Sequence, residues 1–179
     1  LQIENSLKSR TLVVNGVSKA YAMTGWRLGY AGGPKELISQ MNILQSQSTT
    51  HTSSISQAAA IEALNNSEEF INKNKKVYQE RRDIVFSKLK NFDGFDVFLP
   101  QGSFYIYVCC NNLMNKKKED GTLINNDIEF SDYLLDEAGV AVVPGEAFGC
   151  SNYFRTSFAT SKSNLEKGCD KIIEASKKL

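Results

Sequence analysis

Proline, histidine and long apolar runs are scarce in this sequence. It has three prolines and one histidine among 179 residues, of which 41% are hydrophobic and 23% are charged. This is the composition of an ordinary globular protein, and it excludes a largely disordered chain. No apolar run approaches the ~20 residues that span a bilayer, and residues 1–10 have no signal-peptide core. We therefore expect a cytoplasmic protein without a membrane partner.

Neither sign of charge is in excess. Lys and Arg together number 21 and Asp and Glu number 20, which leaves a net charge of +1. A near-neutral chain offers no broad electrostatic surface to nucleic acid or anionic lipid. The lysine run at 116–118 has no interleaved aromatic residues, so it indicates a solvated loop and no nucleic-acid partner. The expected partner is a small molecule.

Cysteine is also sparse, and its spacing matches no known framework. Two of the four cysteines are adjacent and two are scattered, at Cys109, Cys110, Cys150 and Cys169. This spacing fits neither a set of disulfides nor a set of zinc ligands. We interpret all four as free thiols in a reducing compartment. We predict no metal site, and His51 is interpreted as an ordinary histidine.

What the sequence does contain is an alternation of strand-like and helix-like segments. The β-branched run Thr11–Asn15 predicts a buried strand that ends in an Asn-Gly turn. A glycine-rich, aromatic stretch follows up to Pro34, which takes the first position of a helix. Residues 53–64 predict a second, alanine-rich helix that we expect to be buried. Residues 67–90 repeat apolar side chains about every seven residues and predict one long amphipathic helix.

The remainder predicts a small α/β unit. Its expected elements are strands at 95–99 and 103–110, a solvated loop at 111–126, a helix at 127–138, strands at 140–143 and 154–158, and a helix from about Ser163. Ser163 and Glu166 have the spacing of a capping box. Helices and strands in this order can form a domain of their own.

Lys19 follows the first predicted strand, in the string SKAYAMTGWRLGY. An ammonium buried without a partner is costly, so a lysine just after a buried strand needs an explanation. A reactive amine that forms a Schiff base with an aldehyde is one explanation. An ordinary surface lysine is the other, and taken alone it is the more frequent case.

Arg27 lies between Gly25 and Gly29, which allow a ligand to approach the backbone closely. A guanidinium held there suits bidentate binding of a phosphate. An arginine at a strand edge, paired with a surface carboxylate, explains the residue equally well when it is considered alone.

These residues together resemble a known family. Ser18-Lys19 followed by Gly25-x-Arg27-x-Gly29 resembles the cofactor-lysine motif of class I/II pyridoxal-phosphate-dependent aminotransferases. The longer string NGVSKAYAMTGWRLGYAGGP is similar to the bacterial aspartate aminotransferase branch, and so long a match is specific. The resemblance covers essentially the whole chain. It includes Gly102-Ser103-Phe104-Tyr105, Val143-Pro144-Gly145, and Arg155 within FRTSFA.

The resemblance implies roles for three residues. Lys19 would bind pyridoxal 5'-phosphate as a Schiff base and would then act as general base and acid for the proton that moves between Cα and C4′. Arg27 would hold the cofactor phosphate. Arg155 would bind the substrate α-carboxylate as a fork and so orient the Cα–H bond. The expected reaction moves an amino group between an amino acid, aspartate or prephenate/arogenate, and 2-oxoglutarate, in a homodimer.

The implied fold is α/β, that of fold-type-I pyridoxal-phosphate-dependent transferases. We expect residues 1–65 to complete the large cofactor domain, 66–92 to form an interdomain helix, and 93–179 to form the small domain. Gly16 stands where many relatives carry a phosphate-binding hydroxyl. The family's aspartate on the pyridine nitrogen precedes the lysine and is not among these residues. We therefore expect the 179 residues alone to be a fragment that is inactive.

Two other functions remain open at this stage. An aminotransferase-like domain could sense the cofactor or an amino acid within a transcription regulator, and a winged-helix segment upstream would identify that case. Alternatively, the same cofactor could support decarboxylation or condensation. A panel of amino donors and oxoacid acceptors would separate those reactions from transamination.

Overall fold

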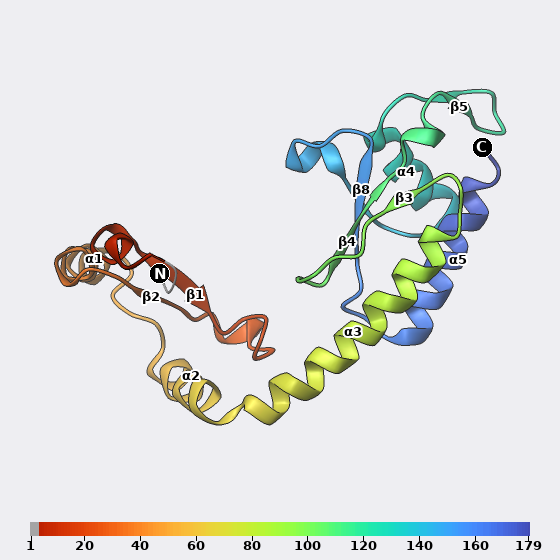
Figure 1. The fold of residues 1–179 in the computed structure, drawn as a ribbon. Helices are drawn as coiled ribbons and strands as arrows, with labels where there is room; N and C mark the ends of the chain where they lie inside the picture. The colour runs from red at the N-terminus through yellow and green to blue at the C-terminus, as the bar shows by residue number, and fades with distance from the viewer. Residues whose placement is uncertain (1–3) are drawn as a thin grey trace. The chain divides into compact units, whose positions relative to one another are not determined.

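The protein was studied as a computed structural model that describes residues 4–179. The chain divides into two compact units, Leu1–Asn74 and Lys75–Leu179. The boundary falls inside the continuous helix α3 (Glu68–Lys90), which is drawn in yellow and green in Figure 1. The division into 1–65, 66–92 and 93–179 stays a prediction.

The first unit is a two-stranded antiparallel ribbon followed by two helices. Val13 pairs with Gly32, and Gly16 pairs with Gly29. Its elements are η1 (Asn5–Arg10), β1 (Val13–Gly16), η2 (Thr24–Trp26), β2 (Gly29–Gly32), α1 (Lys35–Ser48) and α2 (Ser54–Asn66). The predicted strand and both predicted helices are therefore present.

Burial in the first unit differs from the expectation. Val14 of β1 is 71% exposed, and Ile55 and Ile61 of α2 are 72% and 61% exposed. β1 pairs only with β2, and the small core of this unit buries only Val17, Met23 and Ala60 among the described residues. The expectation of a buried first strand and a buried second helix is wrong because no described element covers these faces.

The second unit is a four-stranded antiparallel sheet packed against helices. The strand order is β3-β4-β8-β7. Its elements are the end of α3, β3 (Asp96–Val97), β4 (Tyr105–Cys109), η3 (Asn111–Leu113), β5 (Lys116–Lys117), β6 (Leu123–Ile124), α4 (Asp127–Ala138), β7 (Val143–Pro144), η4 (Gly145–Phe148), β8 (Tyr153–Ser157) and α5 (Lys162–Ser176). The mixed α/β class is confirmed.

Alternation along β4 and β8 gives the sheet two different faces. Ile106, Val108 and Phe154 are fully buried and pack with side chains of α3, α4 and α5. Successive side chains of a strand point to opposite faces, so Tyr107 and its register partner Arg155 lie on the other face. That second face is only half-buried. The sheet therefore has one core face and one half-buried face, and Arg155 lies on the half-buried face.

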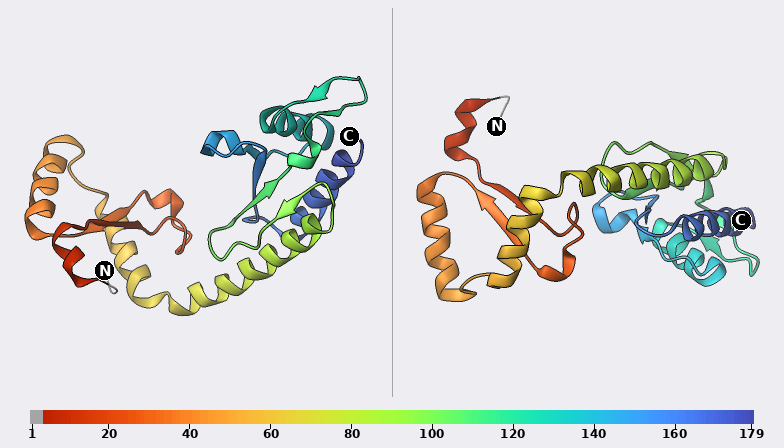
Figure 2. Two further views of the ribbon diagram at one scale, coloured as in Figure 1. Left: turned by 45° about the horizontal axis from the view of Figure 1, so that its top comes forward. Right: turned by 90° about the horizontal axis from the view of Figure 1, so that it is seen from below.

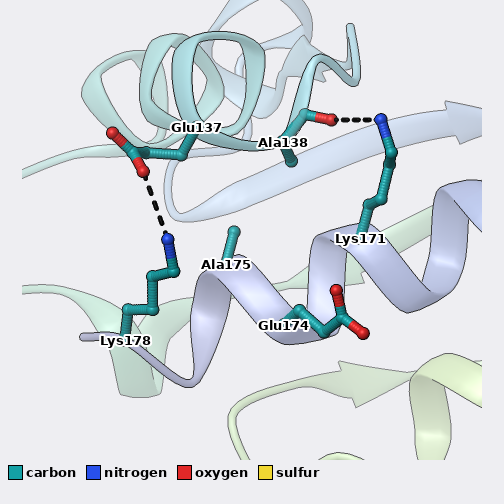
Figure 3. Close-up of a pocket in the computed structure, with 6 residues that line it drawn as sticks. All are labelled: Glu137, Ala138, Lys171, Glu174, Ala175 and Lys178. Carbon is teal, nitrogen blue, oxygen red and sulfur yellow. Dashed lines mark hydrogen bonds and ion pairs between the residues drawn. The ribbon is translucent and has the colours of Figure 1, made fainter.

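Charged side chains join the helices of the second unit. Helices α3 and α5 run side by side (Figure 2), where Lys88 Nζ lies 2.5 Å from Asp170 Oδ1. Lys171 Nζ donates to the carbonyl of Ala138 at 3.1 Å, at the end of α4. Figure 3 shows this contact beside a shallow pocket of about 200 Å³. A cation at the C-terminal end of a helix meets the unpaired carbonyls and stabilises that end.

Three local expectations in this unit need correction. Residues 111–126 are not a wholly solvated loop, because β5 and β6 pair and because Leu113 and Ile124 are 5% and 0% exposed. The strand expected at 140–143 is limited to β7 (Val143–Pro144). The cap of α5 is Ser161, whose side chain accepts from Asn164 N, so the predicted capping box two residues later lies inside the helix.

Among the helices of residues 4–179, none combines the length and the apolar character that a bilayer crossing requires.

Candidate active site

The connection between β1 and β2 carries both Lys19 and Arg27. Val17 at its start is fully buried, and Met23 in its middle is 8% exposed. Both side chains pack against Ala60 of α2. The connection is therefore anchored to the helix at two points, and these anchor points flank Lys19 along the chain.

Lys19 lies in the turn that follows β1. The amide of Ala22 donates to the carbonyl of Lys19 at 3.1 Å, which closes this turn, and the lysine side chain is exposed. Its place after the first strand is as expected, but the strand is not buried within this unit. The role of Lys19 therefore stays a prediction.

Arg27 has an uncommon backbone conformation. Its φ of 50° and ψ of 53° are left-handed, a region that non-glycine residues seldom occupy and that costs free energy. Its Nη1 donates to the carbonyl of Thr24 at 2.9 Å, and no ion pair to this side chain occurs within residues 4–179. A side chain at Gly25 would meet no atom within 4 Å. The guanidinium is thus held from one side, with further donors that can bind an anion.

Arg155 is held between two aromatic rings of the second unit. Its Cζ lies 4.1 Å from the centre of the Tyr105 ring and 4.3 Å from that of the Phe148 ring. We call this set the aromatic sandwich. Attraction to the ring faces orients a guanidinium without using its N–H donors. No ion pair or side-chain hydrogen bond of Arg155 occurs within residues 4–179, so its N–H donors are open to an acceptor.

The turn η4 places Phe148 against this arginine. The amide of Gly149 donates to Glu146 O at 3.0 Å, and the hydroxyl of Tyr107 donates to Gly145 O at 3.3 Å. Burial raises the pKa of Tyr107, and nearby Cys150 raises it further, so the phenol keeps its proton and remains a donor. The turn is therefore closed on itself and fixed to β4.

The structure brings some of the predicted residues together. Lys19 and Arg27 share one connection in the first unit, whereas Arg155 belongs to the second unit. The sequence analysis assigned no role to Phe148 because a single aromatic residue in a turn carries no specific signal. The alternation of Tyr105 and Tyr107 along their strand was the only hint that aromatic side chains share a face with Arg155.

The four cysteines and His51 are the residues to which the sequence analysis assigned no functional role. The four cysteines are free thiols, and burial raises the pKa of Cys110 to about 12 and that of Cys169 to about 11. His51 Nδ1 lies 2.8 Å from Thr52 O on the surface. Over the described part of the chain, no three His, Cys, Asp or Glu side chains gather in a way that could hold a metal ion.

A family model for "Aminotransferase class I and II" matches residues 2–172. The chain therefore belongs to the class I and II aminotransferase family, as the cofactor-lysine motif had indicated. The chain spans less than half the length of the curated relatives it matches.

Two of the relatives that the chain matches are bacterial proteins whose names include aspartate. The chain is 50% identical to an aspartate aminotransferase of Rhizobium meliloti, over 99% of this chain and 43% of that protein. It is 52% identical to a probable aspartate/prephenate aminotransferase of Rickettsia conorii, over 96% of this chain and 43% of that protein.

Solved structures agree. The crystal structure of the aspartate aminotransferase of Rhizobium meliloti aligns with a TM-score of 0.96 at 50% identity, over 99% of this chain and 44% of that one. An aspartate aminotransferase of Thermus thermophilus, solved with maleate, aligns with a TM-score of 0.83 at 38% identity, over 94% of this chain and 42% of that one. The expected fold of type I pyridoxal-phosphate-dependent transferases is confirmed.

Proposed function

We propose that the protein carrying this chain is an aminotransferase that moves an amino group between aspartate and 2-oxoglutarate, with pyridoxal 5'-phosphate as its cofactor. The observation that carries the proposal is the aromatic sandwich, in which a guanidinium that has no ion-pair partner within residues 4–179 is oriented on the half-buried face of the sheet. A fork of this kind suits bidentate binding of a carboxylate. Both substrates of the proposed reaction carry an α-carboxylate.

The donors of the first unit fit the proposed cofactor. An aldehyde needs a primary amine, which Lys19 supplies, and a phosphate needs several N–H donors, which Arg27 supplies. Thr24 O occupies only one donor position of Arg27, and space is open at Gly25. When bound, pyridoxal phosphate supplies an electron sink for the bond that breaks at the substrate Cα.

The chain's own residues then divide the work. The amine of Lys19 takes the proton from the substrate Cα and then delivers a proton to C4′. Arg155 binds the α-carboxylate and so fixes the direction of the Cα–H bond, which is where positioning contributes to rate. Arg27 binds the phosphate and so holds the cofactor next to Lys19.

The names of the relatives support two substrate ranges. One relative is named for aspartate alone and another for aspartate and prephenate. We propose aspartate as the first amino donor to test, with prephenate as the second acceptor besides 2-oxoglutarate. We further propose that the protein is a homodimer. We also propose a cytoplasmic location, in line with the four free thiols of the chain.

The first test is borohydride reduction of the full-length protein after incubation with pyridoxal phosphate, followed by peptide mass mapping. We expect the label on Lys19 and its loss in a Lys19→Ala variant. Lys35→Ala is the matched control, because Lys35 is an exposed lysine at the start of α1 and has no proposed role. A label spread over surface lysines, or absent from Lys19 in the folded protein, would refute the proposal.

The second test is turnover with a panel of amino donors and oxoacid acceptors. Transfer from aspartate to 2-oxoglutarate supports the proposed reaction, and transfer to prephenate extends it. Loss of the α-carboxyl group as carbon dioxide, without amino transfer, would identify a decarboxylase.

A further inference from the structure

The buried carboxylate of Asp127 is not used by the chemistry proposed above. Asp127 is the first residue of α4 and is fully buried. Its Oδ2 accepts from the amide of Glu146 at 3.0 Å and from the amide of Tyr153 at 3.4 Å. Its Oδ1 has no hydrogen-bond partner among the described residues. A buried ionisable side chain with one oxygen unpaired is costly and calls for an explanation.

Each of the two amides comes two residues before a member of the aromatic sandwich along the chain. Glu146 precedes Phe148 by two residues in the turn η4, and Tyr153 precedes Arg155 by two residues in β8. One carboxylate oxygen therefore joins the segment that carries the ring to the segment that carries the guanidinium.

Packing around the turn makes this link stiff. A Cβ atom at Gly145 would overlap Cys150 O and would lie 2.8 Å from Tyr153 Cβ, so the turn packs directly against the start of β8. The amide of Cys150 donates to Gly145 O at 3.1 Å. The carboxylate also lies at the N-terminal end of α4, where the helix dipole favours a negative charge.

We propose that Asp127 is a positioning residue that sets the distance between Phe148 and Arg155 and thereby orients the guanidinium for the substrate carboxylate. The inference rests on the proposed function, since it concerns the same arginine. Hydrogen bonds to an ionised acceptor are about twice as strong as neutral ones, so a neutral residue at this position holds the turn less firmly.

The test compares Asp127→Asn with the wild type in the full-length protein. Asn keeps the shape but loses the charge and buries an amide donor where Oδ1 now lies. We expect faster amide hydrogen exchange confined to residues 145–155. We also expect KM for both the amino acid and the oxoacid to rise about ten-fold, with kcat within about two-fold, because binding shared by ground and transition states is weakened.

Two further variants separate positioning from stability. Asp170→Asn removes the surface ion pair with Lys88 in the same unit and should leave KM and the exchange of residues 145–155 unchanged. Phe148→Leu alters the 49% exposed ring without disturbing the core, and it should raise KM even if Asp127→Asn does not fold. An unchanged KM in Phe148→Leu would overturn the inference.

The outcomes remain distinct from those of the proposed function. Faster exchange in Asp127→Asn with unchanged KM would make Asp127 a purely structural residue and overturn the positioning role. Unchanged exchange would also overturn it. A wild-type protein without any transamination would refute the proposed function itself, which the exchange data cannot do because they are collected without substrate.

Discussion

Replacing Arg155 by lysine tests the aromatic sandwich most directly. Lysine keeps the positive charge but loses the planar fork. One of the two hydrogen bonds to the substrate carboxylate is then lost, which costs about 1.5–3 kcal/mol for a charged group. The guanidinium lies 4.1 Å and 4.3 Å from two ring centres, and an ammonium can face only one of them. That loss adds about 0.5–1 kcal/mol at a partly exposed site.

Together these terms predict that kcat/KM falls about 30- to 1,000-fold, because each ~1.4 kcal/mol corresponds to a factor of ten. The assay is steady-state transamination by the full-length protein, with aspartate and 2-oxoglutarate varied in turn. Stability should change by only about 1 kcal/mol, since the Arg155 side chain makes no ion pair or side-chain hydrogen bond within residues 4–179. Thermal unfolding measured in parallel checks this second expectation.

The matched control is Arg81→Lys. Arg81 also faces a tyrosine ring, that of Tyr78 at 5.3 Å, but it has no proposed role. We expect unchanged kcat/KM for this variant. A loss below about five-fold in Arg155→Lys, which is worth only about 1 kcal/mol, would refute the assignment of Arg155 as the carboxylate-binding residue.

Three further predictions concern stability and reactivity. Phe154→Ala should cost about 3–5 kcal/mol of unfolding free energy in chemical denaturation, since its buried ring meets two others at 5.4 and 5.7 Å; a loss under about 1 kcal/mol would contradict this packing. The hydrogen bond from Asn125 N lowers the pKa of Glu129 in the folded protein. The ionised Glu129 therefore stabilises the fold above the pKa that this carboxyl has in the unfolded chain, and this stabilisation is lost as the pH falls through the lower pKa of the folded protein. Glu129→Gln should therefore flatten the acid limb of stability against pH, and an unaltered limb would count against it. Burial raises the pKa of Cys110 to about 12, so iodoacetamide at pH 8 should modify Cys109 first in peptide mapping, and the reverse order would show that the core opens readily.

Helix α4 shows what sequence alone could predict. Its bounds, Asp127–Ala138, agree with the expectation because both ends carry local signals. Asn126 accepts from Glu129 N at 2.9 Å at the start, and Gly139 takes the left-handed conformation with φ of 62° at the end. Signals that act within one turn of a helix are readable without any knowledge of the fold.

The errors concern properties that depend on distant parts of the chain. Whether Val14 is buried depends on what covers the ribbon, and the β-branched pattern cannot supply that information. Ile124 looked like part of a solvated insertion, yet it is fully buried against the core of the second unit.

The same distinction holds for the site. Lys19 and Arg27 were predicted from one contiguous motif and Arg155 from its place in the resemblance to the family, and the roles of all three stay predictions. Asp127 was missed because the amides that it accepts from lie 19 and 26 residues further along the chain. A sequence pattern does not report a contact at that separation.

The tight corner at Gly145 has a consequence for attempts to change substrate range. Even the smallest side chain there would collide with backbone atoms, whereas Glu146, Ala147 and Phe148 are exposed and meet no such barrier. A mutational library of this turn should therefore divide into one position that does not tolerate substitution and three permissive positions at which the fold tolerates it, including Phe148, where a change is expected to raise KM. Variation that reshapes the wall beside Arg155 can be introduced at the three permissive positions while the corner itself is left unchanged.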